Sequence, residues 1–164
     1  MWVKKSEFDK LIDPEKFQVF ILSSKVSFPF HFGIHTWIVI SEKGKLHRWE
    51  VWRTKNNCKT SWGHVHKNMF KSYLWTKDWF FKKYFFKRKS RERFLWKVIE
   101  GGEGSNAERI IKFINKNASK YPLIHEYGFF FGPNSNTFTQ WILDSSSETK
   151  VKLPFWAFGR NYKV

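Results

Sequence analysis

Short apolar runs rich in β-branched and aromatic residues dominate the first third of the chain. The run at 17–28, FQVFILSSKVSF, predicts a strand pair or one long, bent strand. The runs at 34–40 and 46–52 predict two more strands, and the polar residues EKGK at 42–45 predict the turn between them. These two runs are therefore expected to pair as a β-hairpin.

Two stretches in the second half have the spacing of helices. After a glycine-rich break, the isoleucines at 110, 111 and 114 form an apolar stripe, and Ser105 with Glu108 matches a capping box. A second helix is expected within GPNSNTFTQWIL at 132–143, because Phe138, Trp141 and Ile142 then share a face.

Two aromatic segments flank this second helix. The residues HEYGFFF at 125–131 predict a short strand just before it. The residues LPFWAFGRNY at 153–162 predict a tail that packs back onto the body of the protein.

The order of these elements predicts the fold class. Strands, a helix, a further strand, a second helix and a packed tail indicate an α+β protein with a small antiparallel sheet and packed helices. A chain of 164 residues fits one domain, since domains most often have about 100–150 residues. Apolar residues make up 41% of the chain, with 19 Phe and 10 Trp, which argues against disorder. We therefore expect residues 1–164 to form a single domain.

The net charge of +16, from 30 Lys and Arg against 14 Asp and Glu, suits a polyanionic partner such as nucleic acid, anionic lipid or an acidic wall polymer. Nine of the basic residues lie within 77–97, interleaved with aromatic residues. This basic aromatic block predicts binding to an anionic membrane surface or nucleic acid. The residues expected to do so are Lys82, Lys83, Lys87, Arg88, Lys89 and Arg91. The alternative is that its aromatics belong to the core and its lysines form a solvated rim.

The sequence offers neither a membrane span nor a signal peptide, since no apolar run approaches about 20 residues and residues 1–17 lack an apolar core. We therefore expect a cytoplasmic protein, soluble or peripheral to a membrane. The single cysteine, Cys58, excludes an intrachain disulfide and multi-cysteine zinc sites. His64 and His66 would share a face of an extended segment, but the sequence supplies no third ligand. We expect no metal and no other cofactor.

Ser135, at the expected start of the second helix, is the first candidate for chemistry. A helix N-terminus carries about half a positive charge and free backbone N–H groups, which stabilise an oxyanion or activate a nucleophile. The alternative is that Asn134, Ser135 or Asn136 is the N-cap, since these residue types are strongly preferred there. A serine nucleophile also needs a base, usually His, that a third polar group orients.

His35 is the best candidate for that base because it heads a strongly apolar strand, where an imidazole is conspicuous. The alternative is a half-exposed histidine whose nitrogens bond with the backbone. In the partner strand, alternation places Glu50 on one face and His47 on the other, and either side chain is able to orient His35.

Five short strings occur in an order that resembles a bacterial family of domain of unknown function 3750. They span about residues 28–162, and the block at 74–97 between them is poorly matched. GPNSNTF is the most specific string. The strings are HTWIVI, HRWEVW, VIEGGEGSNAERIIKFI, YP followed by GPNSNTFTQWIL, and LPFWAFGRNY.

The motif order of that family is similar to a circularly permuted papain-like fold, which occurs in cell-wall amidases and lecithin retinol acyltransferase-like enzymes. The resemblance implies a groove in which Ser135 holds the position of the thiol nucleophile and His35 that of the base. His47 is the nearest match to the orienting residue. The expected ligand contacts are Asn134, Asn136, Trp37 and Glu50.

Serine in place of cysteine departs from that pattern, because a serine lacks thiolate chemistry. Two functions follow from the sequence. The first is amide or ester hydrolysis, or acyl transfer, with Ser135 as nucleophile and His35 as proton shuttle. The second is a non-catalytic binding module that keeps the groove and engages a membrane surface or nucleic acid through the block at 77–97.

Overall fold

The computed structural model describes residues 1–26, 33–73, 93–146 and 150–164. Most strands come before the two long helices along the chain, and the fold is α+β as expected. In chain order the elements are β1 (Trp2–Val3), α1 (Lys5–Lys10), β2 (Phe17–Lys25), β3 (Ile34–Glu42), β4 (Lys45–Val51), β5 (Ser61–Trp62), β6 (Val65–Lys67), β7 (Arg93–Gly101), α3 (Asn106–Asn117), the 3₁₀ helix η1 (Ala118–Lys120) and α4 (Ser135–Ser145).

One antiparallel sheet organises the described part of the chain. Its strands lie in the order β1-β7-β2-β3-β4-β6-β5. β2 pairs with both β3 and β7, and apolar clusters cover both of its faces, so its interior is buried and contains the continuous apolar run at 19–22. The run at 17–28 thus contains one strand, β2, that ends at Lys25.

The predicted hairpin is confirmed as β3 and β4. Its turn residues Lys43 and Gly44 have positive φ angles of 49° and 86°. Two successive positive φ angles give the turn a twist that matches that of the paired strands, which explains why glycine stands at the second position.

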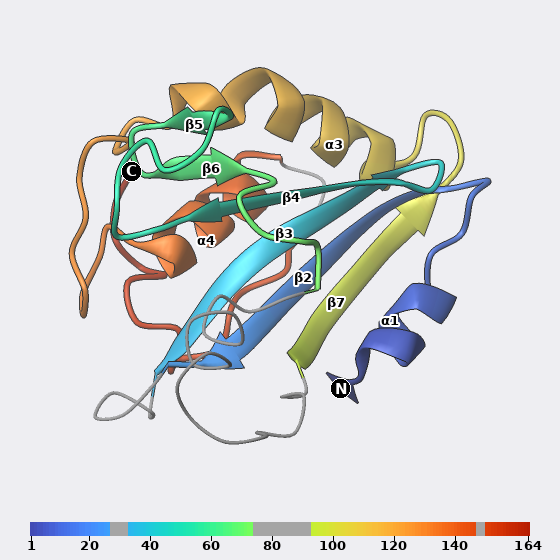
Figure 1. The fold of residues 1–164 in the computed structure, drawn as a ribbon, viewed down its shortest axis with the longest axis horizontal. Coiled ribbons are helices and arrows are strands. Elements are labelled where there is room, and N and C mark those ends of the chain that lie inside the picture. Colours follow the sequence, from blue (N-terminus) through green and yellow to red (C-terminus); the bar gives the residue numbers. More distant parts are fainter. Residues whose placement is uncertain (27–32, 74–92, 147–149) are drawn as a thin grey trace.

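Helices cover one face of the sheet and α1 covers part of the other (Figure 1). Val19 and Ile38 point to the first face and pack with Ile110 of α3 and Phe138 of α4. Residues of the opposite parity on the same strands pack around Phe8 of α1. The predicted apolar stripes of both helices are therefore confirmed as core-facing surfaces.

The predicted tail also packs back, since Leu153 and Ala157 are buried against Ile21 and Leu143. The expected strand at 125–131 is wrong. Those residues form turns, because the chain closes on itself where the Gly128 N–H donates to Pro133 O over 2.7 Å.

The strands β3 and β4 diverge toward one end of the sheet (Figure 1). Their pairing ends at Ile38 and Trp49, whereas β4 continues along β6 to Val51 and β3 extends back to Ile34 beside β2 alone. The helix α4 contacts both strands. His35 therefore lies in the part of β3 that β4 has left, at a fork that α4 closes.

The buried stripe of α3 gives a test of the core. We expect Ile110→Ala to lower the free energy of unfolding by about 2–5 kcal/mol, because it removes fully buried methyl groups and leaves a cavity. Urea denaturation measures this loss. Lys116→Ala, at an exposed position of the same helix, is the control and should change stability by less than about 0.5 kcal/mol. Equal effects of the two substitutions would contradict this packing.

Candidate active site

Asn134, not Ser135, caps α4. Its Oδ1 accepts hydrogen bonds from the backbone N–H groups of Asn136, at 2.9 Å, and Thr137, at 3.4 Å. The Thr137 hydroxyl in turn accepts from the Asn134 N–H at 3.1 Å. Ser135 is thus the first residue of the helix, and its hydroxyl makes no hydrogen bond with any residue in the described ranges.

The amides of the two asparagines support the structure around Ser135. Asn134 Nδ2 donates to the backbone oxygens of Gly128 and Phe158, at 3.2 and 3.1 Å. Asn136 Nδ2 donates to the backbone oxygens of Ile34 and Phe158, at 3.0 and 2.8 Å. Both side chains line the pocket described below, but their amide groups are already bonded to the protein. Within the protein the pair joins the loop, the tail and β3 to the start of α4, and contact of this pair with a ligand stays a prediction.

Thr36 holds α4 against β3. Its buried hydroxyl lies 3.0 Å from both Asn136 Oδ1 and Thr139 Oγ1, and 3.3 Å from Ser135 O. Since Thr36 follows His35 directly, this contact fixes the start of the helix beside His35. Successive side chains of a strand point to opposite sides, so Thr36 faces α4 while His35 projects from the other side of β3.

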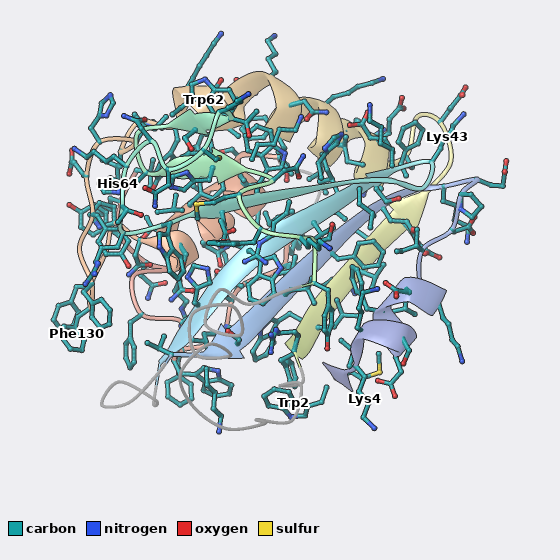
Figure 2. The ribbon with its side chains drawn as sticks, in the orientation of Figure 1. Trp2, Lys4, Lys43, Trp62, His64 and Phe130 are labelled. Carbon is teal, nitrogen blue, oxygen red and sulfur yellow. The ribbon has the colours of Figure 1, made fainter. Side chains whose placement is uncertain are left out.

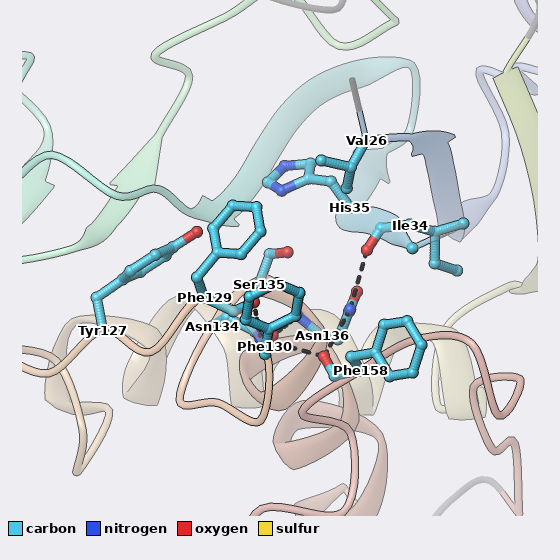
Figure 3. Close-up of a pocket in the computed structure, with 11 residues that line it drawn as sticks. Val26, Ile34, His35, Tyr127, Phe129, Phe130, Asn134, Ser135, Asn136 and Phe158 are labelled. Atoms are coloured by element: carbon cyan, nitrogen blue, oxygen red, sulfur yellow. Dashed lines mark hydrogen bonds between the residues drawn. The ribbon is translucent and has the colours of Figure 1, made fainter. Parts of the chain in front are cut away.

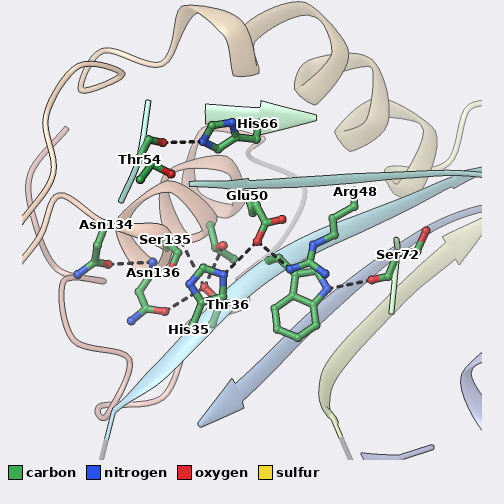
Figure 4. A network of polar contacts seen from close by, with 12 residues as sticks. His35, Thr36, Arg48, Glu50, Thr54, His66, Ser72, Asn134, Ser135 and Asn136 are labelled. Atoms are coloured by element: carbon green, nitrogen blue, oxygen red, sulfur yellow. Dashed lines mark hydrogen bonds and ion pairs between the residues drawn. The ribbon is translucent and has the colours of Figure 1, made fainter. Parts of the chain in front are cut away.

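His35 belongs to a buried polar network with Glu50 and Arg48 (Figure 4). His35 Nε2 lies 3.2 Å from Glu50 Oε2, which also accepts a 2.7 Å hydrogen bond from Arg48 Nη2. The guanidinium of Arg48 lies over the Trp37 ring, 4.4 Å from its centre. All three polar residues are buried, so their charges interact with little screening by water.

The network moves the pKa values of its members. Burial alone would raise the pKa of Glu50, but the Arg48 charge and the hydrogen bonds with His35 and Arg48 hold it below its ordinary value. Burial lowers the pKa of His35, and the Glu50 contact only partly offsets this effect. At neutral pH the site therefore holds a neutral His35 imidazole beside an ionised Glu50 carboxylate. A general base must be neutral in this way before it accepts a proton.

Glu50 thus replaces His47 as the residue that orients His35. His47 projects from the opposite face of β4, where its Nδ1 accepts from Asn68 Nδ2 at 2.9 Å. The family resemblance favoured His47 as the residue that orients His35, while strand alternation allowed either His47 or Glu50. The pairing of β3 with β4 places Glu50 on the same side as His35. Trp37 is corrected too, since it is fully buried under Arg48 and donates to Ser72 O rather than lining the pocket.

A small pocket of about 50 Å³ brings Ser135 and His35 together (Figure 3). The two residues are 5% and 7% exposed, and in Figure 3 the Ser135 hydroxyl points from the start of α4 toward the side where the His35 imidazole lies. No hydrogen bond joins them. The remaining walls are formed by four aromatic residues, two aliphatic residues, a glycine and the two asparagines: Tyr127, Phe129, Phe130, Phe158, Val26, Ile34, Gly33, Asn134 and Asn136.

Sequence reasoning missed two parts of this site. Arg48 and Glu50 are two positions apart on one strand, so the alternation of side chains already placed them on the same face. This pattern could have predicted an ion pair between them. Phe129 and Phe130 were assigned to a strand, and nothing in their local pattern places them on a pocket wall.

His64 and His66, which lacked a third metal ligand in the sequence, do not line this pocket. His66 is bonded to Ser61 Oγ and Thr54 O, and His64 to Trp52 O. Across the described ranges no three His, Cys, Asp or Glu side chains gather as metal ligands. The six basic residues from Lys82 to Arg91 fall outside the described residues. None of the helices in the described ranges has the length and apolar character needed to cross a bilayer.

Comparison with known proteins gives one match. The model of a family described as "Protein of unknown function (DUF3750)" matches residues 16–162. The match covers nearly all of the chain and includes every residue of the pocket. No curated protein and no solved structure matches the chain.

Removal of the buried carboxylate tests the network. We expect Glu50→Gln to lower the free energy of unfolding by about 3–5 kcal/mol, because it leaves the buried Arg48 charge without compensation. Chemical denaturation near neutral pH measures the change. Glu103→Gln, which breaks an exposed pair with Lys43, should cost less than about 1 kcal/mol. A loss at Glu50 no larger than at Glu103 would show that this carboxylate is not ionised in the fold.

The lowered pKa of His35 makes stability depend on pH. The folded state binds this proton less readily than the unfolded state, so the stabilisation is complete above about pH 6.5 and is lost as the pH falls through the folded pKa. We expect the free energy of unfolding to fall between about pH 7 and pH 5, with a shallower slope in His35→Gln. His47, His64 and His66, whose pKa values burial also lowers, contribute to the remaining slope. Identical slopes would mean that folding does not shift the pKa of His35.

Proposed function

We propose that this chain, which belongs to the family of proteins of unknown function DUF3750, hydrolyses an ester or amide or transfers its acyl group, with Ser135 as nucleophile. The observation that carries the proposal is one pocket shared by Ser135, at the first position of a helix, and by His35, which a buried glutamate holds. A histidine on one strand, an acid on the next and a nucleophile at a later helix start match the arrangement of a circularly permuted papain-like site. We therefore propose a papain-like groove as well.

The three polar residues take distinct roles in this reaction. Ser135 Oγ attacks the carbonyl carbon while its proton passes to His35, and Glu50 stabilises the imidazolium that forms. Because Nε2 of His35 faces Glu50, the proton is accepted at Nδ1. Collapse of the tetrahedral intermediate releases an alcohol or amine, which takes this proton, and leaves an acyl-serine. Water then attacks the acyl-serine in hydrolysis, and a second alcohol or amine does so in acyl transfer.

The start of α4 supplies a donor for the oxyanion. The cap residue Asn134 engages the N–H groups of Asn136 and Thr137, while the N–H of Ser135 makes no hydrogen bond within the described residues. This N–H belongs to the nucleophile itself and lies at the positive end of the helix dipole. It is therefore suited to donate to the carbonyl oxygen as negative charge develops there.

Proton transfer requires a closer approach than the structure shows. Ser135 and His35 line the same pocket. Ser135 lies on the side of β3 that faces α4, whereas the His35 side chain projects from the other side of this strand. A rotation of the serine side chain or one bridging water closes such a gap, as catalytic hydrogen bonds often tighten only when substrate is bound. Rotation is open to Ser135 because no hydrogen bond to the described residues holds its hydroxyl.

A fluorophosphonate probe, which labels activated serines, tests the proposal. We expect labelling of the wild type and an at least tenfold loss in both Ser135→Ala and His35→Gln, since removing a general base costs about 10²–10⁴ in rate. In-gel fluorescence measures the labelling. Ser105→Ala is the matched control, because Ser105 begins the other long helix but faces no histidine, and it should label normally.

A second variant tests the site if Ser135 is too weak a nucleophile to react with the probe. Ser135→Cys, in a Cys58→Ser background, should react with iodoacetamide at least tenfold faster than an exposed thiol at equal pH, because the helix start and His35 favour the thiolate. Absence of both the serine labelling and the thiol reactivity would overturn the catalytic proposal.

A further inference from the structure

A short loop at 128–133 forms one wall of the pocket and extends beyond it. Its ends are fixed, because the Gly128 N–H donates to Pro133 O over 2.7 Å and Asn134 Nδ2 donates to Gly128 O over 3.2 Å. A Cβ on Gly128 would lie 2.2 Å from Gly132 O, so the two ends of the loop are in direct contact. The loop is therefore a closed turn anchored to the start of α4.

Three consecutive phenylalanines occupy this loop. Phe131 is 82% exposed, and Phe129 and Phe130 are 43% and 40% exposed. Neighbouring rings lie 5.1 and 6.3 Å apart between centres. Tyr162, 41% exposed, lies at the foot of the loop, where its Cβ is 3.1 Å from the Cβ position of Gly132. These four aromatic residues are called the aromatic tip, and its three neighbouring phenylalanine rings form an exposed apolar surface of the kind that marks an interaction site.

Basic side chains flank the aromatic tip. Arg53, His64 and His125 line a second, more open hollow, which shares two phenylalanines of the tip with the first pocket. No carboxylate lines this hollow within the described residues. An apolar aromatic surface beside a guanidinium such as that of Arg53 suits an anionic lipid surface, since the rings enter the interface and the cation meets headgroup charge.

We infer that the aromatic tip inserts into the surface of a membrane containing anionic lipid and places the mouth of the Ser135 pocket against the headgroups. A second copy of the chain is the other occupant that an apolar patch suggests. The charge of +16 on each copy opposes that association, while the same charge attracts an anionic bilayer.

This docking also defines a substrate class for the proposed reaction. Phe129 and Phe130 belong both to the tip and to the wall of the pocket, so a molecule held in the interface meets the pocket without leaving the membrane surface. The substrate is accordingly an ester or amide of a membrane-held amphiphile. This second step rests on the proposed function, whereas the docking itself does not.

Vesicle flotation tests the docking. The full chain is mixed with vesicles of phosphatidylcholine alone or with about 30% phosphatidylglycerol, at low and high salt. Wild type and Ser135→Ala should both float with the anionic vesicles. Phe131→Ala should weaken that binding about tenfold and abolish the fraction that survives high salt, because salt does not screen the favourable transfer of an inserted phenylalanine ring out of water.

Two further variants separate the tip from the charge of the whole chain. Trp62→Ala removes an exposed aromatic residue from another side of the molecule (Figure 2) and should bind like the wild type. Arg53→Gln should weaken binding only to the anionic vesicles and chiefly at low salt. Binding that is absent, or that Phe131→Ala leaves unchanged, would overturn the docking, as would a dimer in sedimentation that Phe131→Ala dissociates.

The outcomes also distinguish the docking from the reaction. Vesicle binding by a chain whose Ser135 shows no reactivity would sustain the docking and reject the substrate class. Reactivity toward soluble esters without vesicle binding would sustain the proposed reaction and reject the docking. Phe131→Ala is expected to retain at least half of the wild-type labelling by the fluorophosphonate probe, because this ring is exposed and does not line the pocket.

Discussion

The contact between the first turn of α4 and the diverging end of β3 is the constraint on which the site depends. Where β4 leaves β3, the backbone and side chains of β3 lose a neighbour, and Thr36 and Asn136 fill that space with buried hydrogen bonds. Buried polar groups are costly when unpaired, so a network of this kind is stable only in one arrangement. It therefore sets the position of Ser135 relative to His35 without a direct contact between them.

The second constraint is electrostatic. Arg48 and Glu50 are fully buried, and a buried ion pair often stabilises a fold less than well-packed apolar residues of the same volume would. The presence of this ion pair is better explained by its effect on His35, which lies against the ionised Glu50 carboxylate. The pKa of His35 stays lowered because burial outweighs the opposing effect of Glu50. Strongly shifted groups gathered at a pocket are typical of functional sites, and structural networks produce them too. The open Ser135 hydroxyl in the same pocket is what favours the functional interpretation here.

The sequence placed the main elements well and one loop wrongly. Strand runs with β-branched residues, a stripe of isoleucines and a capping serine each act over a few residues, so local pattern was enough to locate β3, β4 and α3. The segment at 125–131 has equally apolar residues, yet its backbone closes through Gly128 and Pro133 instead of joining the sheet. An aromatic run becomes a strand only where the edge of a sheet is free to pair with it. The local sequence does not show whether such an edge lies nearby in the fold.

For the site, the sequence by itself determined which residues are chemically able to act: a serine at a helix start, a histidine heading a strand, and an acid or a second histidine on the next strand. Only the tertiary structure decided that Asn134 is the cap, that Glu50 rather than His47 meets His35, and that an aromatic loop borders the pocket. The reason is physical. Propensity and alternation act between neighbours in the chain, whereas these contacts join residues up to about a hundred positions apart, where the register of strands and the docking of a helix set the geometry.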